Sequence, residues 1–431
     1  MKRTSFLILL LAVWMPLMQA ENTFPFAIFE KMQQTVEGNI IVSPASLEQA
    51  IGMAANGAVG TTLPPLLDLT GDESLSALNQ RNQTMAELLN EHRDDTVSYM
   101  RVANSVWHLP YVTLLEPFRD SVVARYDARI DTANFATQQG IDSVNAWVCN
   151  NTDSLITEIL EKPDPTLVVA LINTTLFHGA WDWSLNPYAV GKQPFLNADG
   201  SGTNVEMVQI KDLYRTAPVY LDDELVAVGV KFSGQDYASY YRVLFIMPRD
   251  YENMVALTAE RWHNLLEHKQ QQYVNILVPK FDVSCNEEML PRLKEMGAFV
   301  ANDFSGITPE AFVQRIIHST RMTLDEKGMS AAAVTALMCA TGMPEPKPFI
   351  DFIVNRPFYV AIMAEGSDEP VFLAKIKQLA GDACAAPMAE HITLGLENLQ
   401  SATRATKYIR NGQLFLETTS GTYSATGQQL K

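Results

Sequence analysis

The segment from Thr323 to Pro344 limits the fold of this chain more than any other stretch. Its charged start, Glu326-Lys327, is followed by the conformational pivot Gly328, and small or β-branched residues then continue to Ala336. In an extended conformation, every second residue would share one face: Met329, Ala331, Ala333 and Thr335. Side chains this small could slide between two existing strands. An Ala-rich helix is the alternative, because Ala is the best helix former.

A second constraint is the apolar run from Thr166 to Phe177, which is rich in β-branched residues. This composition predicts a central strand that is covered on both faces. Asn173 lies in its middle and must find a hydrogen-bond partner, because an unpaired buried amide costs ~1–3 kcal/mol. Amphipathic patterns predict helices at 25–35, 47–55, 114–126, 141–160, 251–266 and 289–296. With no internal repeat or linker before residue 380, we expect one large domain that mixes helices and sheets.

Composition narrows the classes of partner. Of the 431 residues, 47% are hydrophobic, which suits a chain with a sizeable core, and the formal net charge is −17. Such an acidic surface argues against nucleic acid, heparin-type polyanions and anionic membranes as general partners. The sequence has no G-x-S-x-G, no H-E-x-x-H, no phosphate loop and no dinucleotide fingerprint. We therefore expect no enzymatic activity, no cofactor and no metal site.

The N-terminus and the cysteines bear on the compartment. Residues 1–20 have a basic start, a short apolar core and a small residue at position 20, which predicts a secretory signal peptide and an extracellular protein. The apolar run is short for a membrane anchor. Four scattered cysteines form neither a disulfide scaffold nor a zinc motif: Cys149, Cys285, Cys339 and Cys384. Cys339 is free, pairs with Cys384 or serves as a small apolar filler; the sequence leaves all three open.

Several motifs in order along the chain resemble those of the serpins. They are Ser43-Pro-Ala-Ser46 with 57–62, Asn173 to Trp181 with its Phe-His-Gly-Ala-Trp ending, Val-Pro-Lys-Phe281, Asp-Phe-Ser-Gly-Ile307, the hinge-like 326–333, Asn-Arg-Pro-Phe358 and the C-terminal hairpin 358–376. The resemblance covers about 22–379. It implies an α+β fold with three β-sheets, eight or nine helices and an exposed reactive-centre loop. We expect a signal peptide at 1–20, a serpin domain at 21–379 and a C-terminal extension at 380–431.

The resemblance also implies a mechanism. A serpin is a suicide substrate: a serine protease cleaves and acylates the exposed loop, and the loop's hinge then inserts as a new strand in the main sheet, distorting the protease. The hinge residues here are Glu326, Lys327, Gly328, Met329, Ser330, Ala331, Ala332, Ala333, Val334 and Thr335. Met329 departs from the Thr or Ser that inhibitory members usually carry, so insertion could be slower. The alternative is a non-inhibitory serpin that acts as a binding, carrier or storage protein.

Family spacing from Glu326 places the scissile bond near Gly342-Met343. The spacing does not fix the scissile bond to one position, and the alternative bonds involve Leu337, Met338, Cys339, Ala340 and Thr341. Because neither Lys nor Arg occurs between Gly328 and Pro346, the expected targets are elastase-, chymotrypsin- or subtilisin-like enzymes and not trypsin-like ones. We expect the protein to be a monomer.

Further site residues follow from the same resemblance. Ser43, Ser46, Asn173 and His318 would form a hydrogen-bonded lock beneath the sheet, and Trp181 would sit at the top of the strand. Surface sequons predict glycans at Asn82 and Asn150, whereas the sequon at Asn173 falls in the central strand. The extension at 380–431 favours a flexible tail, with one hairpin signal at Asn411-Gly412.

Overall fold

The computed structural model describes residues 23–182, 185, 187–211, 215–249, 254–309, 311–329 and 349–385, and the backbone of four strands between 406 and 430. Its α-helices are α1 (Phe24–Thr35), α2 (Pro44–Ala55), α3 (Leu63–Thr70), α4 (Leu75–Asn90), α5 (Glu116–Tyr126), α6 (Gln138–Asn151), α7 (Ala259–Glu267) and α8 (Leu290–Glu295), and Gly60–Thr62 is a 3-10 helix. Eight α-helices in this described part, together with several sheets, confirm the predicted α+β class.

The main sheet contains the predicted central strand. Its strands are β2 (Ser98–His108), β3 (Arg129–Thr132), β4 (Val169–Trp181), β12 (Phe281–Glu288), β13 (Ile317–Asp325) and β14 (Gly328–Met329), in the order β3-β2-β4-β14-β13-β12. β2 and β4 pair along the whole length of β2, antiparallel and without a break. The apolar run thus forms the strand that the sequence predicts, shifted toward its C-terminal end.

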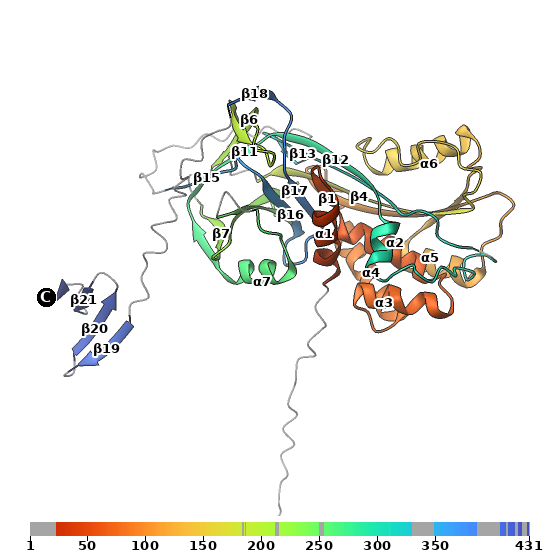
Figure 1. The fold of residues 1–431 in the computed structure, drawn as a ribbon, viewed down its shortest axis with the longest axis horizontal. Coiled ribbons are helices and arrows are strands. Elements are labelled where there is room, and N and C mark those ends of the chain that lie inside the picture. Colours follow the sequence, from red (N-terminus) through yellow and green to blue (C-terminus); the bar gives the residue numbers. More distant parts are fainter. Residues whose placement is uncertain are drawn as a thin grey trace, which may run out of the picture.

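A second sheet joins the first at the top of β4, where Ala180 and Trp181 pair with Ser233 and Phe232. It holds β1 (Ile40–Val42), β7 (Ala217–Leu221), β8 (Leu225–Ser233), β9 (Tyr241–Pro248), β10 (Lys269–Gln272), β16 (Phe358–Ala364) and β17 (Phe372–Ile376). Its order is β10-β7-β8-β9-β16-β17-β1, so the predicted hairpin of β16 and β17 lies inside it. Figure 1 shows the two sheets running into each other around β4.

The third sheet contains the strand that follows the loop. It is built from β15 (Ile350–Ile353), β11 (Val274–Pro279), β6 (Gly202–Lys211) and β18 (Asp382–Cys384), and β5 (Tyr188–Leu196) pairs with the other edge of β6. β18 belongs to the C-terminal extension, so the first residues of that extension are part of the folded body. Beyond it, β19 (Thr406–Arg410), β20 (Gln413–Thr418), β21 (Gly421–Ser424) and β22 (Gln429–Leu430) form a small antiparallel meander, and the hairpin predicted at Asn411-Gly412 is confirmed.

Helices cover both faces of the main sheet. In Figure 1, α6 lies on one face, and α2 to α5 lie on the other. α2 starts at Pro44 after Ser43, whose side chain accepts a hydrogen bond from the Ser46 N–H and so caps the helix. α6 buries its own apolar cluster, which includes Trp107, Phe135, Ile141, Val144, Trp147 and Ile172. The prediction that this helix continues to residue 160 is wrong, because Asp153 and Ser154 turn the chain at positive φ (45° and 62°).

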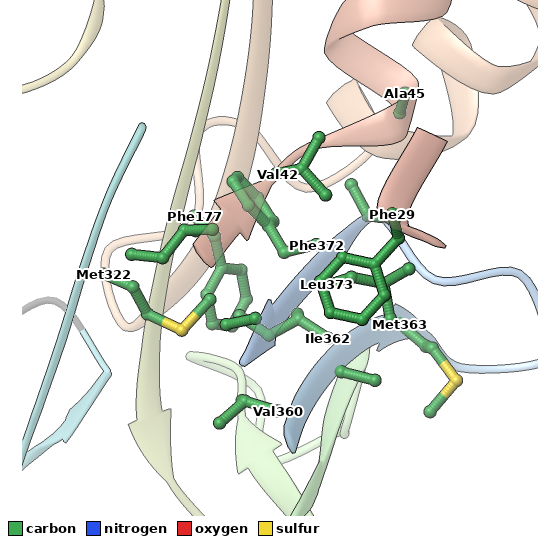
Figure 2. Close-up of a cluster of buried hydrophobic side chains, with 14 of the residues drawn as sticks. Phe29, Val42, Ala45, Phe177, Met322, Val360, Ile362, Met363, Phe372 and Leu373 are labelled. Carbon is green, nitrogen blue, oxygen red and sulfur yellow. The ribbon is translucent and has the colours of Figure 1, made fainter. Parts of the chain in front are cut away.

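The main core lies where the two large sheets meet. Figure 2 shows Phe177 of β4 and Met322 of β13 together with side chains of β16 and β17, including Ile362 and Phe372. These four side chains are at most 7% exposed. The core therefore lies directly against β4 and β13 on one face of the main sheet.

Candidate strand-insertion site

The two residues of β14 lie between β4 and β13 at the top of the main sheet. Met329 pairs with Gly179 on one side and with Leu324 on the other, and Gly328 pairs with Ala180 and Asp325. Gly328 has φ 152°, and a Cβ there would lie 1.9 Å from the carbonyl oxygen of Gly179. Only glycine fits this position. Met329 is 1% exposed, and its side chain is already packed in the main hydrophobic core.

Below Met329, β4 and β13 separate. Both strands are described over their full length, and neither pairs with the other: the remaining neighbours are β2 and β8 for β4, and β12 for β13. A cavity of about 20 Å³ lies directly below Met329, lined by Phe177, Met322, Ile362 and Phe372 among others. A larger one, about 110 Å³, lies farther down between β4 and residues 312–318. We call this whole space the β4–β13 gap.

Contacts above Met329 hold the top of the gap. The indole N–H of Trp181 donates to the Asp325 carbonyl oxygen (3.0 Å), and its ring stacks on Phe232 with centroids 5.2 Å apart. Asp325 Oδ1 accepts hydrogen bonds from the backbone N–H groups of Lys327 and Gly328. An ion pair joins Lys280 to Glu326 at 2.5 Å and lowers the pKa of the Glu326 carboxyl. The turn that leads into β14 is thus fixed at several points.

The middle of the gap holds the four residues predicted as a lock. Ser46 Oγ donates to Asn173 Oδ1, and Asn173 Nδ2 donates to Asn104 Oδ1 (2.7 Å). On the other side, the Ser43 N–H donates to His318 Nε2 (3.1 Å). His318 is buried, and desolvation lowers its pKa to about 4, so the ring is neutral near pH 7. Because Nε2 is the acceptor, Nδ1 carries the proton.

The lock is therefore two hydrogen-bonded pairs, one on each wall of the gap. They are connected through α2, where the Ser46 N–H donates to Ser43 Oγ (3.3 Å). Within the described contacts, His318 and Asn173 are not bonded to each other. Both pairs face the space between the strands, because Ser46, Asn173 and His318 all line the larger cavity. A chain that entered the gap would pass directly between them.

The sequence analysis missed how far this polar network extends. Asn104 Nδ2 also donates to Gln49 Oε1 (3.2 Å), and Gln49 Nε2 donates to the backbone oxygen of Asn82 (2.8 Å). Arg81 then bridges Glu48 and Asp72. Besides Ser46, the mostly apolar helix α2 contains two polar residues, Glu48 and Gln49, and these were the available signal.

This network corrects the glycan prediction at Asn82. Asn82 is 1% exposed, and its Nδ2 donates to the Glu48 carbonyl oxygen (3.2 Å) and to the Tyr126 hydroxyl (3.5 Å). A glycan on that nitrogen is incompatible with this packing, so the prediction is wrong. Asn150 is exposed on α6.

Other predicted site residues fall outside the described part of the chain. They are residues 1–20, the hinge residues Ser330, Ala331, Ala332, Ala333, Val334 and Thr335, and the reactive-bond candidates Leu337, Met338, Cys339, Ala340, Thr341, Gly342 and Met343. Cys149, Cys285 and Cys384 carry free thiols, and burial raises the pKa of the Cys285 thiol. In the described residues, no group of three or more His, Cys, Asp or Glu side chains could hold a metal ion. None of the described helices is long and apolar enough to cross a bilayer.

The comparisons with known proteins agree with this geometry. Residues 19–379 match the family described as Serpin (serine protease inhibitor). Serpin A3-3 of Bos taurus is 27% identical over 381 residues, which cover 84% of this chain and 88% of the relative. The native structure of tengpin, a thermophilic serpin, has a TM-score of 0.70 at 25% identity and covers 83% of this chain and 93% of its own.

A structure of thyroxine-binding globulin with thyroxine has a TM-score of 0.69 and covers 83% of this chain and 98% of its own. At 19% identity, this likeness shows the fold alone. The family match, in contrast, extends over most of the chain and ends where the sequence motifs end. On this basis, the protein is a member of the serpin family.

Proposed function

We propose that this serpin inhibits serine proteases as a suicide substrate, by inserting its cleaved loop into the β4–β13 gap. The observation that carries the proposal is β14: Gly328 and Met329 already form the first two positions of a strand between β4 and β13. The backbone groups of both strands below that point face the gap without pairing across it. An incoming chain could pair with both strands.

Continued beyond Met329, the register of β14 would give each hinge residue a defined pair of neighbours. Each step beyond Met329 moves one residue back along β4 from Gly179 and one back along β13 from Leu324. Two steps on, Ala331 would lie between Phe177 and Met322. Six steps on, Thr335 would lie between Asn173 and His318. Thr335, the one polar residue on the core-facing side of the inserted strand, would then meet the polar pairs, where its hydroxyl could accept from His318 Nδ1.

Side-chain size supports the same register. Ala331 would enter the 20 Å³ cavity beside Phe177 and Met322, where a larger side chain would overpack the core at a cost of about 1–3 kcal/mol. The inward positions that follow are Ala333 and Thr335, also small. Met329 is the one large side chain on this face, and it is already buried. Its departure from the family hinge therefore does not by itself prevent insertion.

The energy for insertion comes from the new strand. Seven residues, 330–336, placed between two strands could form roughly ten additional hydrogen bonds at about 1 kcal/mol each. Burial of their small apolar side chains adds to this. A gain of that order is enough to drive a large rearrangement once cleavage frees the loop.

The proposal extends to the class of protease that is inhibited and to secretion of the protein. The absence of Lys and Arg from Gly328 to Pro346 favours elastase-, chymotrypsin- or subtilisin-like targets, with the scissile bond near Gly342-Met343. We also propose that the protein has no catalytic activity of its own, is secreted as a monomer after loss of residues 1–20, and carries a glycan at Asn150. Heparin-type polyanions, nucleic acid and membranes are not expected partners at a net charge of −17.

A non-inhibitory binding, carrier or storage role is the second candidate, and Met329 favours it as a departure from inhibitory hinges. Incubation with elastase, chymotrypsin, subtilisin and trypsin, followed by a denaturing gel, separates the two. A denaturant-stable adduct of protease and cleaved serpin is expected with at least one of the first three. The first residue of the released peptide, read by mass spectrometry, identifies the bond. Clean cleavage without an adduct by every protease would favour the carrier role.

A further inference from the structure

The segment Thr152–Ile156, which we call the strap, lies against the β4–β13 gap just below Met329. Three of its residues line the 20 Å³ cavity together with residues of β4 and β13: Thr152, Leu155 and Ile156. Thr152 Oγ1 accepts a hydrogen bond from the Ile156 N–H (3.2 Å), which closes the strap on itself. Asp153 and Ser154 have positive φ, a conformation that non-glycine residues keep only when other contacts hold it.

The contacts that hold the strap converge on the carboxylate of Asp153. Oδ2 accepts from the Tyr99 hydroxyl (2.5 Å), and Oδ1 accepts from Arg101 Nη1 (3.0 Å). The Arg101 guanidinium also lies 4.2 Å from the centroid of the Tyr99 ring. Tyr99 and Arg101 both belong to β2, so these bonds tie the strap to a strand that pairs with β4 throughout.

The same contacts reach the strand beside the gap. The Tyr99 ring stacks on His178 of β4, with centroids 4.9 Å apart and planes 15° from parallel. The next residue, Gly179, is the partner of Met329. A continuous set of contacts thus leads from Asp153 to Met329, the last described residue of β14.

We propose that Asp153 is a latch that holds the strap over the gap and sets the rate at which a strand inserts below Met329. This inference rests on the proposed function. Alternate residues of the new strand, Ser330 and Ala332, would face away from the core, on the side where the strap lines the cavity. The strap must lift before they can enter. Asp153 is a positioning residue: it acts on insertion through the strap and touches neither protease nor loop.

The strength of the latch follows from its exposure. The side chains of Asp153 and Arg101 are 41% and 36% exposed, so water and salt screen the ion pair. Exposed pairs of this kind change an equilibrium or a barrier by no more than about five-fold. The latch therefore delays insertion and does not block it.

The test measures insertion without a protease. The full-length protein is incubated with a synthetic peptide that has the sequence of residues 330–341, and the rise in melting temperature is followed over time. The variants are Asp153→Asn and Tyr99→Phe. The control is Asp142→Asn, an exposed carboxylate on α6 that accepts from Gln138 Nε2 (2.8 Å) on the same helix. Hydrogen exchange at 152–156 reports strap opening directly.

Both variants should take up the peptide faster, by up to about five-fold, and should exchange faster at 152–156, while Asp142→Asn should match the wild type. Raised salt should screen the ion pair and so bring the uptake rate of the wild type closer to that of Asp153→Asn. Unchanged uptake rates in both variants, or an equal gain in Asp142→Asn, would overturn the latch alone. If no peptide enters the wild type or any variant, the gap does not accept a strand, and the proposed function falls together with the latch.

Discussion

A single charge placed at adjacent hinge positions distinguishes the two faces of the inserted strand. If the register of β14 continues, residue 331 would face Phe177 and Met322, which are 7% and 5% exposed, whereas residue 332 would lie beside Arg321, whose side chain is 37% exposed. Ala331→Glu would bury a carboxylate without a partner, at a cost on the order of 4 kcal/mol. Ala332→Glu would lie beside the partly exposed ion pair of Arg321 and Asp282, with an effect of at most about 1 kcal/mol.

These two energies predict different fates for the acylated protease. At 1.36 kcal/mol per factor of ten, Ala331→Glu slows insertion by about a thousand-fold, so the ester hydrolyses first and the variant is cleaved as a substrate. Ala332→Glu should form adduct within a few-fold of the wild type. The assay is the ratio of denaturant-stable adduct to cleaved serpin on a gel, at a fixed excess of serpin over protease. Equal behaviour of the two variants, or loss of adduct only in Ala332→Glu, would refute the register.

Three further predictions concern the polar network around the gap. His318→Ala removes the acceptor of the buried Ser43 N–H and should lower the stability by about 1–3 kcal/mol and promote polymers; an unchanged melting curve with a monomeric elution profile contradicts this. The depressed pKa of His318, about 4 against 6.5, means that the unfolded state binds the proton more readily, so up to about 3 kcal/mol of stability is lost as pH falls from 6.5 toward 4. Across this window the melting temperature of the wild type should fall as the pH is lowered, and that of His318→Gln should fall less. Finally, Asn82→Ala should lower the stability of the protein by about 1–3 kcal/mol, whereas Asn150→Ala should leave the melting temperature unchanged. Glycopeptide mapping after expression in a glycosylating host should find no glycan on Asn82. A glycan on Asn82 of the folded protein would contradict the packing of its side chain.

Local patterns in the sequence predicted the elements whose structure is decided locally. The apolar run at 166–177 gave β4, and the Asn-Gly pair at 411–412 gave a hairpin. The length of α6 was wrong because its end depends on Asp153, whose left-handed turn is held by side chains of a distant strand. The family and the α+β class are confirmed, since they depend on many motifs in order.

The separation of β4 from β13 could not be predicted, because nothing in either strand marks which of its edges lies along the gap. The burial of Asn82 has the same cause. Its sequon is a three-residue pattern, whereas its environment is made by α2 and α5, which are distant in sequence. The position of Met329 also depends on this separation: the sequence showed a bulky hinge residue, and only the tertiary structure shows the space that it fills.

Strand β18 has a consequence for the boundary of the domain. Asp382, Ala383 and Cys384 lie opposite Asn204, Thr203 and Gly202, and Lys192 reaches Asp382 at 2.5 Å. A protein ended at Leu379, where the family match stops, would leave the backbone amides and carbonyls of the start of β6 facing water. Open edges of this kind recruit other strands, so trimming the chain to its family limits would replace the three-residue edge strand β18 by the uncovered start of the longer strand β6 and would favour self-association.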